Sequence, residues 1–413
     1  MTSYTFNSNS LRLTRSRLLK LYVLTAVLVV FGFVCLEVTV RYRESLKQPD
    51  VMQSASDLMA ALPNMSISGR ELGNQMLIQN VALFSQYPDP VEITSAYVGT
   101  SRSKILHPSQ FGVPHAVVGA GNTYNEITYG LLLQAEILRL KFPNLKRVYV
   151  ESSFLLRRPG RLMVETDHLK YLPLLKTLTP LCSKASDVPG CHDVFVQAGS
   201  LTNSSTTGWK PEMRRHRSEF RFSSLLPGAQ DSIPVKSDPL LGQLEANGET
   251  KGHFRALTDK SEMRPEISND NIKAQRLRDI TSNAPWDGLF DMFALWGREH
   301  GIQVVLFQPP VRSDLYAYQV KYGLKQHVDD LLRVSDKYQI PFVDLNRPEL
   351  GYMSDWSLFS DEDHMATCVG SGLLLLALEA GVNRFEQKHD LTPVIERSPL
   401  EGDSMLRLSS CKK

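Results

Sequence analysis

Residues 286–310 read WDGLFDMFALWGREHGIQVVLFQPP, and this stretch indicates the fold class. Residues 286–300 are expected to form a helix, and residues 302–307 follow it as an unbroken apolar run that ends in a Gln-Pro-Pro turn. A short apolar run between turn residues is typical of a strand that is buried on both faces. A helix that leads directly into such a strand predicts a parallel sheet covered by helices.

The alternation of helices and strands continues in both directions along the chain. Further strands are predicted at 93–98, 116–118, 147–151 and 341–345, and further helices at 127–141, 316–338 and 370–380. These strands are apolar runs without polar alternation, which favours a sheet covered on both faces. The predicted fold class is α/β, a three-layer, doubly wound parallel sheet whose ligands bind at the carboxyl ends of the strands.

The regular pattern is interrupted between about residues 157 and 284. This stretch is rich in Ser, Thr, Asn, Gly, Pro and charged residues, and it predicts a large irregular insertion in the α/β domain. The domain is expected to span residues 91–385, with a polar stalk at 41–90 before it and a C-terminal tail at 386–413 after it.

The N-terminus has the pattern of a membrane anchor. Residues 1–20 form a basic tail without acidic residues, and residues 21–40 are apolar apart from Glu37. A helix of this length, at about 1.5 Å per residue, spans the roughly 30 Å hydrocarbon layer of a bilayer. A cleaved signal peptide or a lipoprotein signal would need small residues near a cleavage point, and Val34 stands directly before Cys35 where a lipoprotein signal has Gly or Ala. We therefore expect one retained transmembrane helix.

The placement of basic residues predicts the orientation of this helix. The basic tail favours a cytoplasmic N-terminus by the positive-inside rule. The basic residues Arg41, Arg43 and Lys47 on the other side of the helix reduce the difference in positive charge between the two sides. The expected location is the bacterial inner membrane, crossed once, with the bulk of the chain in the periplasm.

Cysteine usage fits an oxidising compartment, because an even number of cysteines remains besides Cys35. Cys182 and Cys191 flank a Pro-Gly turn, which predicts a disulfide between them. For Cys368 and Cys411 two interpretations stay open, a disulfide that ties the tail to the last helix or two buried free thiols.

The composition excludes several classes of protein. With 46 basic and 44 acidic residues the net charge is only +2, too neutral for binding along a phosphate backbone, so no nucleic-acid partner is expected. Zinc-finger cysteine spacing, a His-Glu-x-x-His motif and a P-loop pattern do not occur, so no metal and no cofactor are expected.

Polar residues with catalytic potential stand at the predicted strand ends. Ser101 follows the first strand, Gly121 and Asn122 follow the second, and Asp361 and His364 stand just before the last helix. A carboxylate can hold one ring nitrogen of a histidine while the other nitrogen takes the proton of a serine. The pattern therefore predicts a nucleophilic site at the carboxyl edge of the sheet.

Each of these residues also has a structural interpretation. Ser101 in a strand-to-helix turn can serve as a helix N-cap. Asp363 competes with Asp361 for the histidine, but Asp361 is preferred because Asp363 is adjacent to His364 in sequence.

With Gly-x-Ser after the first strand, a Gly-Asn turn after the second and Asp-x-x-His before the last helix, the chain resembles the SGNH (GDSL-like) hydrolase superfamily over residues 93–156 and 285–382. Its membrane-anchored layout is similar to that of envelope proteins that modify surface polysaccharides, including alginate O-acetylation and teichoic-acid D-alanyl transfer proteins. The resemblance implies an SGNH-like (flavodoxin-like) sheet, with Ser101 as nucleophile, His364 as base and Asp361 as the acid that orients the base.

The same resemblance implies an oxyanion hole formed by the backbone amides of Ser101 and Gly121. Thr100 stands where the family often has Asp, and the Gly-x-Asn-Asp block after the third strand is replaced by Glu-Ser-Ser at 151–153. The asparagine donor is therefore missing or replaced by Asn122 or Ser153. Loss of one such donor can reduce the rate on the order of a hundredfold.

Two positions are candidates for substrate binding. Arg102, beside the expected nucleophile, could hold an anionic group, or it is a solvated or salt-bridged arginine. Trp209 belongs to a basic and aromatic segment of the insertion that suits sugar rings or acidic glycans, or this segment is a solvated loop.

These observations lead to two hypotheses of function. The first is a membrane-anchored, extracytoplasmic serine esterase or O-acyltransferase acting on an envelope or exported polysaccharide. Its partners would be an acylated glycan, the inner membrane and a membrane-bound acyl carrier or acyltransferase. The second is a non-catalytic SGNH-fold scaffold of a polysaccharide modification or export complex. The Ser, Asp and His set favours the enzyme, and the missing asparagine favours the scaffold.

Overall fold

The computed structural model describes the main part of the chain, which forms two compact units, Met1–Asp50 and Val51–Lys413. The described residues are 8–46, 87–113, 115–119, 130–157, 244–251, 263–267 and 288–388, with short pieces between 57 and 84, between 177 and 188, and at 232–234.

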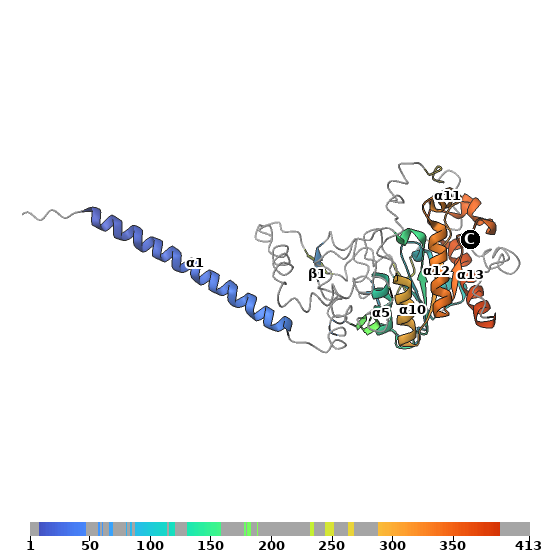
Figure 1. The fold of residues 1–413 in the computed structure, drawn as a ribbon, viewed down its shortest axis with the longest axis horizontal. Helices are drawn as coiled ribbons and strands as arrows, with labels where there is room; N and C mark the ends of the chain where they lie inside the picture. Colours follow the sequence, from blue (N-terminus) through green and yellow to red (C-terminus); the bar gives the residue numbers. More distant parts are fainter. Residues whose placement is uncertain are drawn as a thin grey trace, which may run out of the picture. The chain divides into compact units, whose positions relative to one another are not determined.

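The first unit contains one long helix, α1, which spans Ser8–Leu46 (Figure 1). Its apolar part, Tyr22–Thr39, is long enough to cross a membrane, and none of it is buried. A second helix passes the same test of length and composition at Thr367–Glu386, but 61% of that stretch is buried, as expected for a core helix. The N-terminal helix is therefore an exposed apolar helix, which is typical of a membrane anchor or a signal sequence.

The second unit has a five-stranded, all-parallel sheet at its centre, in the order β3-β2-β4-β6-β7. The strands are β2 (Ser95–Val98), β3 (Ala116–Val118), β4 (Arg147–Glu151), β6 (Gln303–Gln308) and β7 (Phe342–Asp344). The expectation of a parallel α/β fold is confirmed, because each predicted apolar run forms one strand of this sheet.

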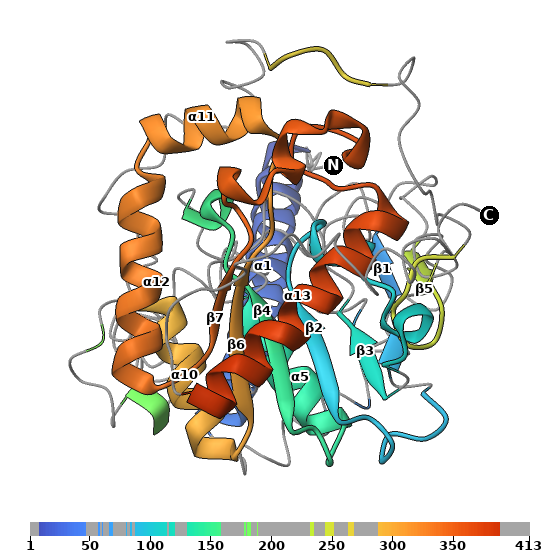
Figure 2. The same cartoon turned by 90° about the vertical axis from the view of Figure 1, so that its right-hand side faces the viewer.

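Helices cover the sheet on both faces because successive strand residues point in opposite directions. Val148 and Val150 of β4 pack into the core beneath three helices, whereas Tyr149 packs into the core beneath α13. The three helices are α5 (Gly130–Lys141), α10 (Leu289–His300) and α12 (Leu324–Tyr338), and α13 spans Thr367–Lys388. Figure 2 shows α13 crossing one face of the sheet. These buried faces explain the unbroken apolar runs in the sequence.

The prediction of one helix over residues 316–338 is wrong. The structure has two helices there, α11 (Ser313–Lys321) and α12, separated by Tyr322 and Gly323. Gly323 has a φ of +105°, a backbone conformation that residues with a side chain rarely adopt and that a right-handed helix does not contain.

Parts of the predicted stalk pack with other regions of the chain. Strand β1 (Ser66–Ser68) pairs antiparallel with β5 (Ser232–Pro234), which lies within the predicted insertion. Phe84 is fully buried and packs edge-to-face against Phe142 after α5. The second unit therefore includes residues before position 90, where the stalk was expected to end.

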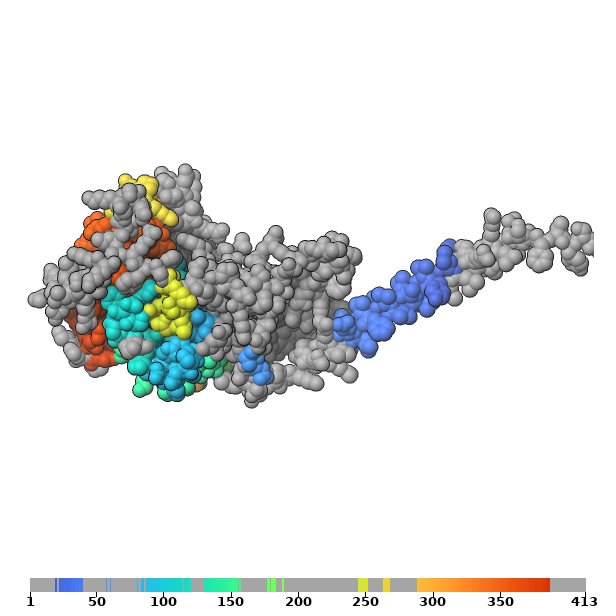
Figure 3. Space-filling view, turned by 180° about the vertical axis from the view of Figure 1, so that it is seen from behind, coloured from blue at the N-terminus to red at the C-terminus, as the bar shows by residue number. Residues whose placement is uncertain are grey.

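One described segment of the insertion, residues 244–251, closes against the edge of the sheet. The Val118 amide of β3 donates a hydrogen bond to the Asn247 carbonyl at 2.8 Å. A Cβ on Gly248 would lie 1.8 Å from the Val118 carbonyl oxygen, so only glycine permits this approach. Figure 3 shows this segment as the yellow patch that lies against the blue and cyan surface.

Candidate active site

Ser101 lies in a tight turn at the carboxyl end of β2. The turn is closed by a hydrogen bond of 3.0 Å from the Ser103 amide to the Thr100 carbonyl. At the base of the turn, a Cβ on Gly99 would lie 1.8 Å from the Ser103 hydroxyl oxygen and 2.6 Å from Glu151 Oε2. A glycine is therefore required where the chain leaves the strand, and this fixes the position of the serine that follows.

His364 lies in a second turn, just before α13. A β-bridge between Phe359 and Met365 and a bond of 2.8 Å from the Ser360 amide to the His364 carbonyl close this turn. One carboxylate oxygen of Asp361 accepts hydrogen bonds from the backbone amides of Asp363 (3.0 Å) and His364 (2.8 Å). The Asp361 side chain thus holds the turn and faces the imidazole at the same time.

The structure brings the three predicted residues together. His364 Nε2 lies 2.7 Å from the Ser101 hydroxyl oxygen, and His364 Nδ1 lies 2.8 and 2.9 Å from the two oxygens of Asp361. All three distances are within hydrogen-bonding range, and the two ring nitrogens serve different partners. This is the geometry in which an imidazole can take a proton from a serine while a carboxylate orients the ring.

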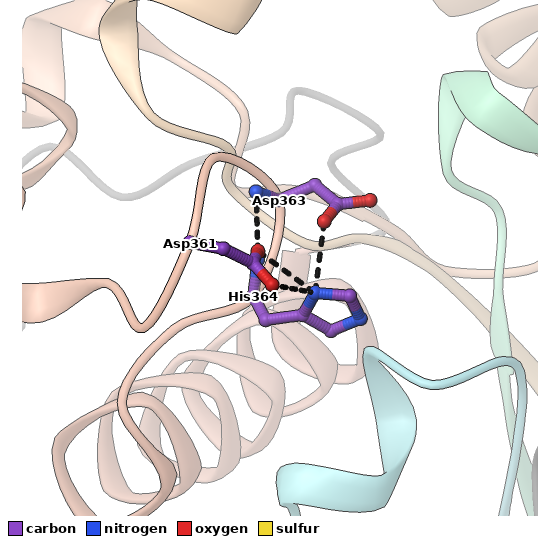
Figure 4. A group of neighbouring side chains, drawn as sticks. All are labelled: Asp361, Asp363 and His364. Atoms are coloured by element: carbon purple, nitrogen blue, oxygen red, sulfur yellow. Dashed lines mark hydrogen bonds and ion pairs between the residues drawn. The ribbon is translucent and has the colours of Figure 1, made fainter. Parts of the chain in front are cut away.

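A second carboxylate contacts the same ring nitrogen. Asp363 Oδ1 lies 2.8 Å from His364 Nδ1, so Asp363 does not point away from the histidine as its sequence position suggested (Figure 4). The other Asp363 oxygen accepts a hydrogen bond from Arg102. The sequence pattern predicted Asp361 as the carboxylate partner of His364, but the turn places Asp363 equally close to His364 Nδ1.

The two carboxylates change the proton equilibrium of His364. Burial by itself lowers the pKa of the imidazole, but the charge of Asp363 and the hydrogen bond to Asp361 outweigh it and raise the pKa from 6.5 to about 10. Burial would raise the pKa of Asp363, but the charges of Arg102 and His364 hold it well below its ordinary value of 3.8. At neutral pH the site therefore contains an ionised Asp363 and a protonated imidazole.

Arg102 is enclosed within the protein, with 6% of its surface exposed. Its Nη2 pairs with Asp363, and its Nη1 lies 3.1 Å from the Thr100 hydroxyl and 3.4 Å from Glu151 Oε1. These contacts match the salt-bridged alternative for Arg102, because its guanidinium faces two buried carboxylates of the protein itself.

Glu151, at the end of β4, was not predicted as a site residue. Its carboxylate is fully buried and accepts hydrogen bonds from the Thr100 amide (2.7 Å), the Ser103 hydroxyl (2.9 Å) and the Ser153 hydroxyl (2.9 Å). The signal in the sequence is a carboxylate at the carboxyl end of the strand RVYVE, directly after three apolar residues. Because its side-chain oxygens accept all of these hydrogen bonds, Glu151 does not replace the asparagine donor that the resemblance implies.

Several predicted residues lie outside the described part of the chain. Gly121 and Asn122, expected in the oxyanion hole, are among them, and so is Trp209 of the insertion.

Of the two cysteines predicted to form a disulfide, Cys191 also lies outside the described residues. Cys182 is disulfide-bonded, and so is Cys368. They pack in the cores on opposite faces of the sheet. The pairing of Cys182 with Cys191 stays a prediction.

Asp361, Asp363 and His364 also bring possible metal-ligand atoms within 4.8 Å of one another. In this arrangement the carboxylate oxygens already contact the imidazole, and the guanidinium of Arg102 faces Asp363. A buried cation beside the donor set opposes the binding of a second cation. The arrangement fits a proton-transfer site better than a metal site.

Fold and site together define an α/β protein with a five-stranded parallel sheet and a Ser-His-Asp cluster beside the end of β2. Comparison with protein-family models, curated proteins and solved structures finds no match to this chain.

Proposed function

We propose that this chain is a membrane-anchored serine esterase or O-acyltransferase of the SGNH-like type, acting outside the cytoplasm on an envelope or exported polysaccharide. The observation that carries the proposal is the 2.7 Å contact between Ser101 and His364, with Asp361 on the opposite ring nitrogen. Residues that are far apart in sequence meet here in the order and with the atoms that nucleophilic catalysis requires.

The chemistry follows from the positions of these atoms. Ser101 Oγ attacks the carbonyl carbon of an acyl ester while its proton moves to His364 Nε2, which must first be unprotonated. The alcohol leaves with that proton, and an acyl group remains on Ser101. Water or a sugar hydroxyl then attacks the acyl-enzyme, again through His364, and the serine is regenerated.

The extracytoplasmic location is inferred from the exposed apolar helix α1 and the disulfide-bonded cysteines Cys182 and Cys368, because disulfides persist outside the cytoplasm. The substrate class follows from the resemblance to envelope proteins that modify surface polysaccharides. The polysaccharide, the inner membrane and a membrane-bound acyl donor are therefore proposed as partners.

The test compares the wild-type chain with Ser101→Ala. Ser101→Ala should fold normally, lose release of acyl groups from a chromogenic ester and lose labelling by a fluorophosphonate probe. Ser357→Ala, which removes a partly exposed serine hydroxyl that donates a hydrogen bond to Asp355, is the matched control and should keep both activities. If Ser101→Ala retains ester cleavage at the wild-type rate, the enzyme proposal fails.

One observation favours a second candidate, a non-catalytic scaffold of a polysaccharide modification or export complex. The Glu-Ser-Ser block at 151–153 stands where the resemblance implies an asparagine donor, and the oxygens of Glu151 accept hydrogen bonds there instead of donating them. Under this alternative, the wild-type chain is not labelled by the probe, whereas glycan acylation in cells depends on the chain but not on Ser101.

A further inference from the structure

A second set of contacts connects the Ser101 turn to His364, besides the direct hydrogen bond between these two residues. Arg102 Nη1 contacts the Thr100 hydroxyl at 3.1 Å and Glu151 at 3.4 Å, and its Nη2 pairs with Asp363. Asp363 in turn lies 2.8 Å from His364 Nδ1. The nucleophile turn and the base turn are therefore linked through one arginine.

Glu151 anchors the other end of this link. Its carboxylate accepts from the Thr100 amide at 2.7 Å and from the Thr100 hydroxyl at 2.8 and 2.9 Å, so it binds the residue directly before Ser101. Both carboxylates that face Arg102 are buried, with Glu151 fully enclosed and Asp363 only 3% exposed. Buried charges hold their geometry because water cannot replace a lost partner.

The shape of arginine matters for this arrangement. Its planar guanidinium offers two separate nitrogens, one to each carboxylate, whereas the ammonium group of lysine is a single point charge. A lysine at position 102 would keep the charge but would not reach both carboxylates in the same way.

We infer that Arg102 is a positioning residue that, by bridging Glu151 and Asp363, fixes the turn carrying Ser101 relative to the imidazole of His364. This inference rests on the proposed acyl-transfer function of the same site. Arg102 contacts Thr100, Glu151 and Asp363, and it acts on the Ser101 turn and on His364 through these residues.

The first measurement is the rate at which a fluorophosphonate probe labels Ser101 in the full-length chain in detergent. Arg102→Gln and Arg102→Lys should both label on the order of a hundredfold more slowly than the wild type, because small misplacements of a nucleophile have effects of that size. The matched control, Arg333→Gln, removes an arginine that pairs with Asp291 and should label at the wild-type rate. Wild-type labelling of Arg102→Lys would show that charge alone suffices and would overturn the inference.

The second measurement does not depend on activity. In chains labelled with ¹⁵N-histidine, the Nδ1 proton of His364 should give a downfield NMR resonance because carboxylates accept it, with assignment by a His364→Gln variant. This resonance should be present in the wild type and in Arg333→Gln, and shifted or lost in both Arg102 variants. If the resonance is unchanged in both Arg102 variants, the inference is overturned, whether or not the wild type is labelled. If the wild type is not labelled by the probe, that result counts against the proposed function and not against the inference.

A third variant covers the case in which the Arg102 variants do not fold. Glu151→Gln keeps an oxygen that accepts the Thr100 amide but removes the charge that faces Arg102. It should slow labelling and shift the His364 resonance. Wild-type labelling together with an unchanged resonance in Glu151→Gln would exclude the bridge.

Discussion

The hydroxyl oxygen of Ser101 lies 2.7 Å from Nε2 of His364, although 263 positions separate the two residues in the chain. The turn after β2 brings Ser101 to this point, and the turn before α13 brings His364. The contact is the strongest structural argument for an acyl-transfer site. Asp363 lies beside His364 in the same site, and Arg102 pairs with Asp363 and Glu151.

The raised pKa of His364 predicts activity that increases toward alkaline pH. The imidazole acts as a base only when unprotonated, so a pKa of about 10 places the rising limb of the rate profile well above neutral pH. Asp363→Asn removes the charge that raises this pKa, so the limb should move to lower pH. The measurement is the pH dependence of ester hydrolysis for both proteins.

Asp355→Asn is the control for this experiment, since Asp355 is an exposed carboxylate that hydrogen-bonds Ser357 and not the imidazole. Its profile should match the wild type. A wild-type limb near pH 6.5, unchanged in Asp363→Asn, would contradict the role given to Asp363.

Gly99→Ala should destabilise the second unit and abolish ester hydrolysis. The new Cβ would lie 1.8 Å from the Ser103 hydroxyl oxygen and 2.6 Å from Glu151 Oε2, and both side chains are buried. Overpacking of this kind costs roughly 1–3 kcal/mol, which chemical denaturation would detect as a lower midpoint. Gly32→Ala is the control, because its new Cβ would meet nothing within 4 Å, and it should leave the denaturation midpoint unchanged.

The exposed apolar helix α1 and the acid-free basic tail at residues 1–20 together predict that the C-terminus lies outside the cytoplasm. A C-terminal alkaline phosphatase fusion should be active in cells, because this reporter folds only after export. The same fusion without residues 1–46 should be inactive. Activity of a reporter that works only in the cytoplasm would contradict this topology.

The disulfide-bonded state of Cys182 predicts a covalent link to Cys191. A peptide map without reduction should show the two cysteines in one linked pair, and Cys182→Ser should leave Cys191 with a free thiol. A link from Cys182 to Cys411, or two free thiols in the wild type, would show that the predicted pairing is wrong.

Local sequence patterns determined the fold class of this protein. The segments RVYVE and IQVVLF form adjacent strands of one parallel sheet, because consecutive apolar residues suit the part of a strand that is buried on both faces. The sequence pattern did not predict the break between α11 and α12, because a glycine permits the positive φ found at Gly323 but does not require it. The apolar composition of residues 21–40 likewise predicted an exposed, membrane-length helix.

For the candidate site, the sequence pattern placed Ser101, Asp361 and His364 in turns at the ends of predicted elements, and this placement predicted them as site residues. Three features follow from the folded chain and not from the pattern: Asp363 also faces the imidazole, Arg102 is buried between two carboxylates, and Glu151 binds the turn that carries Ser101. The reason is physical. The periodicity of apolar residues is a local property of the chain, whereas the partners of a buried charge, and hence its pKa, depend on groups that come from distant segments.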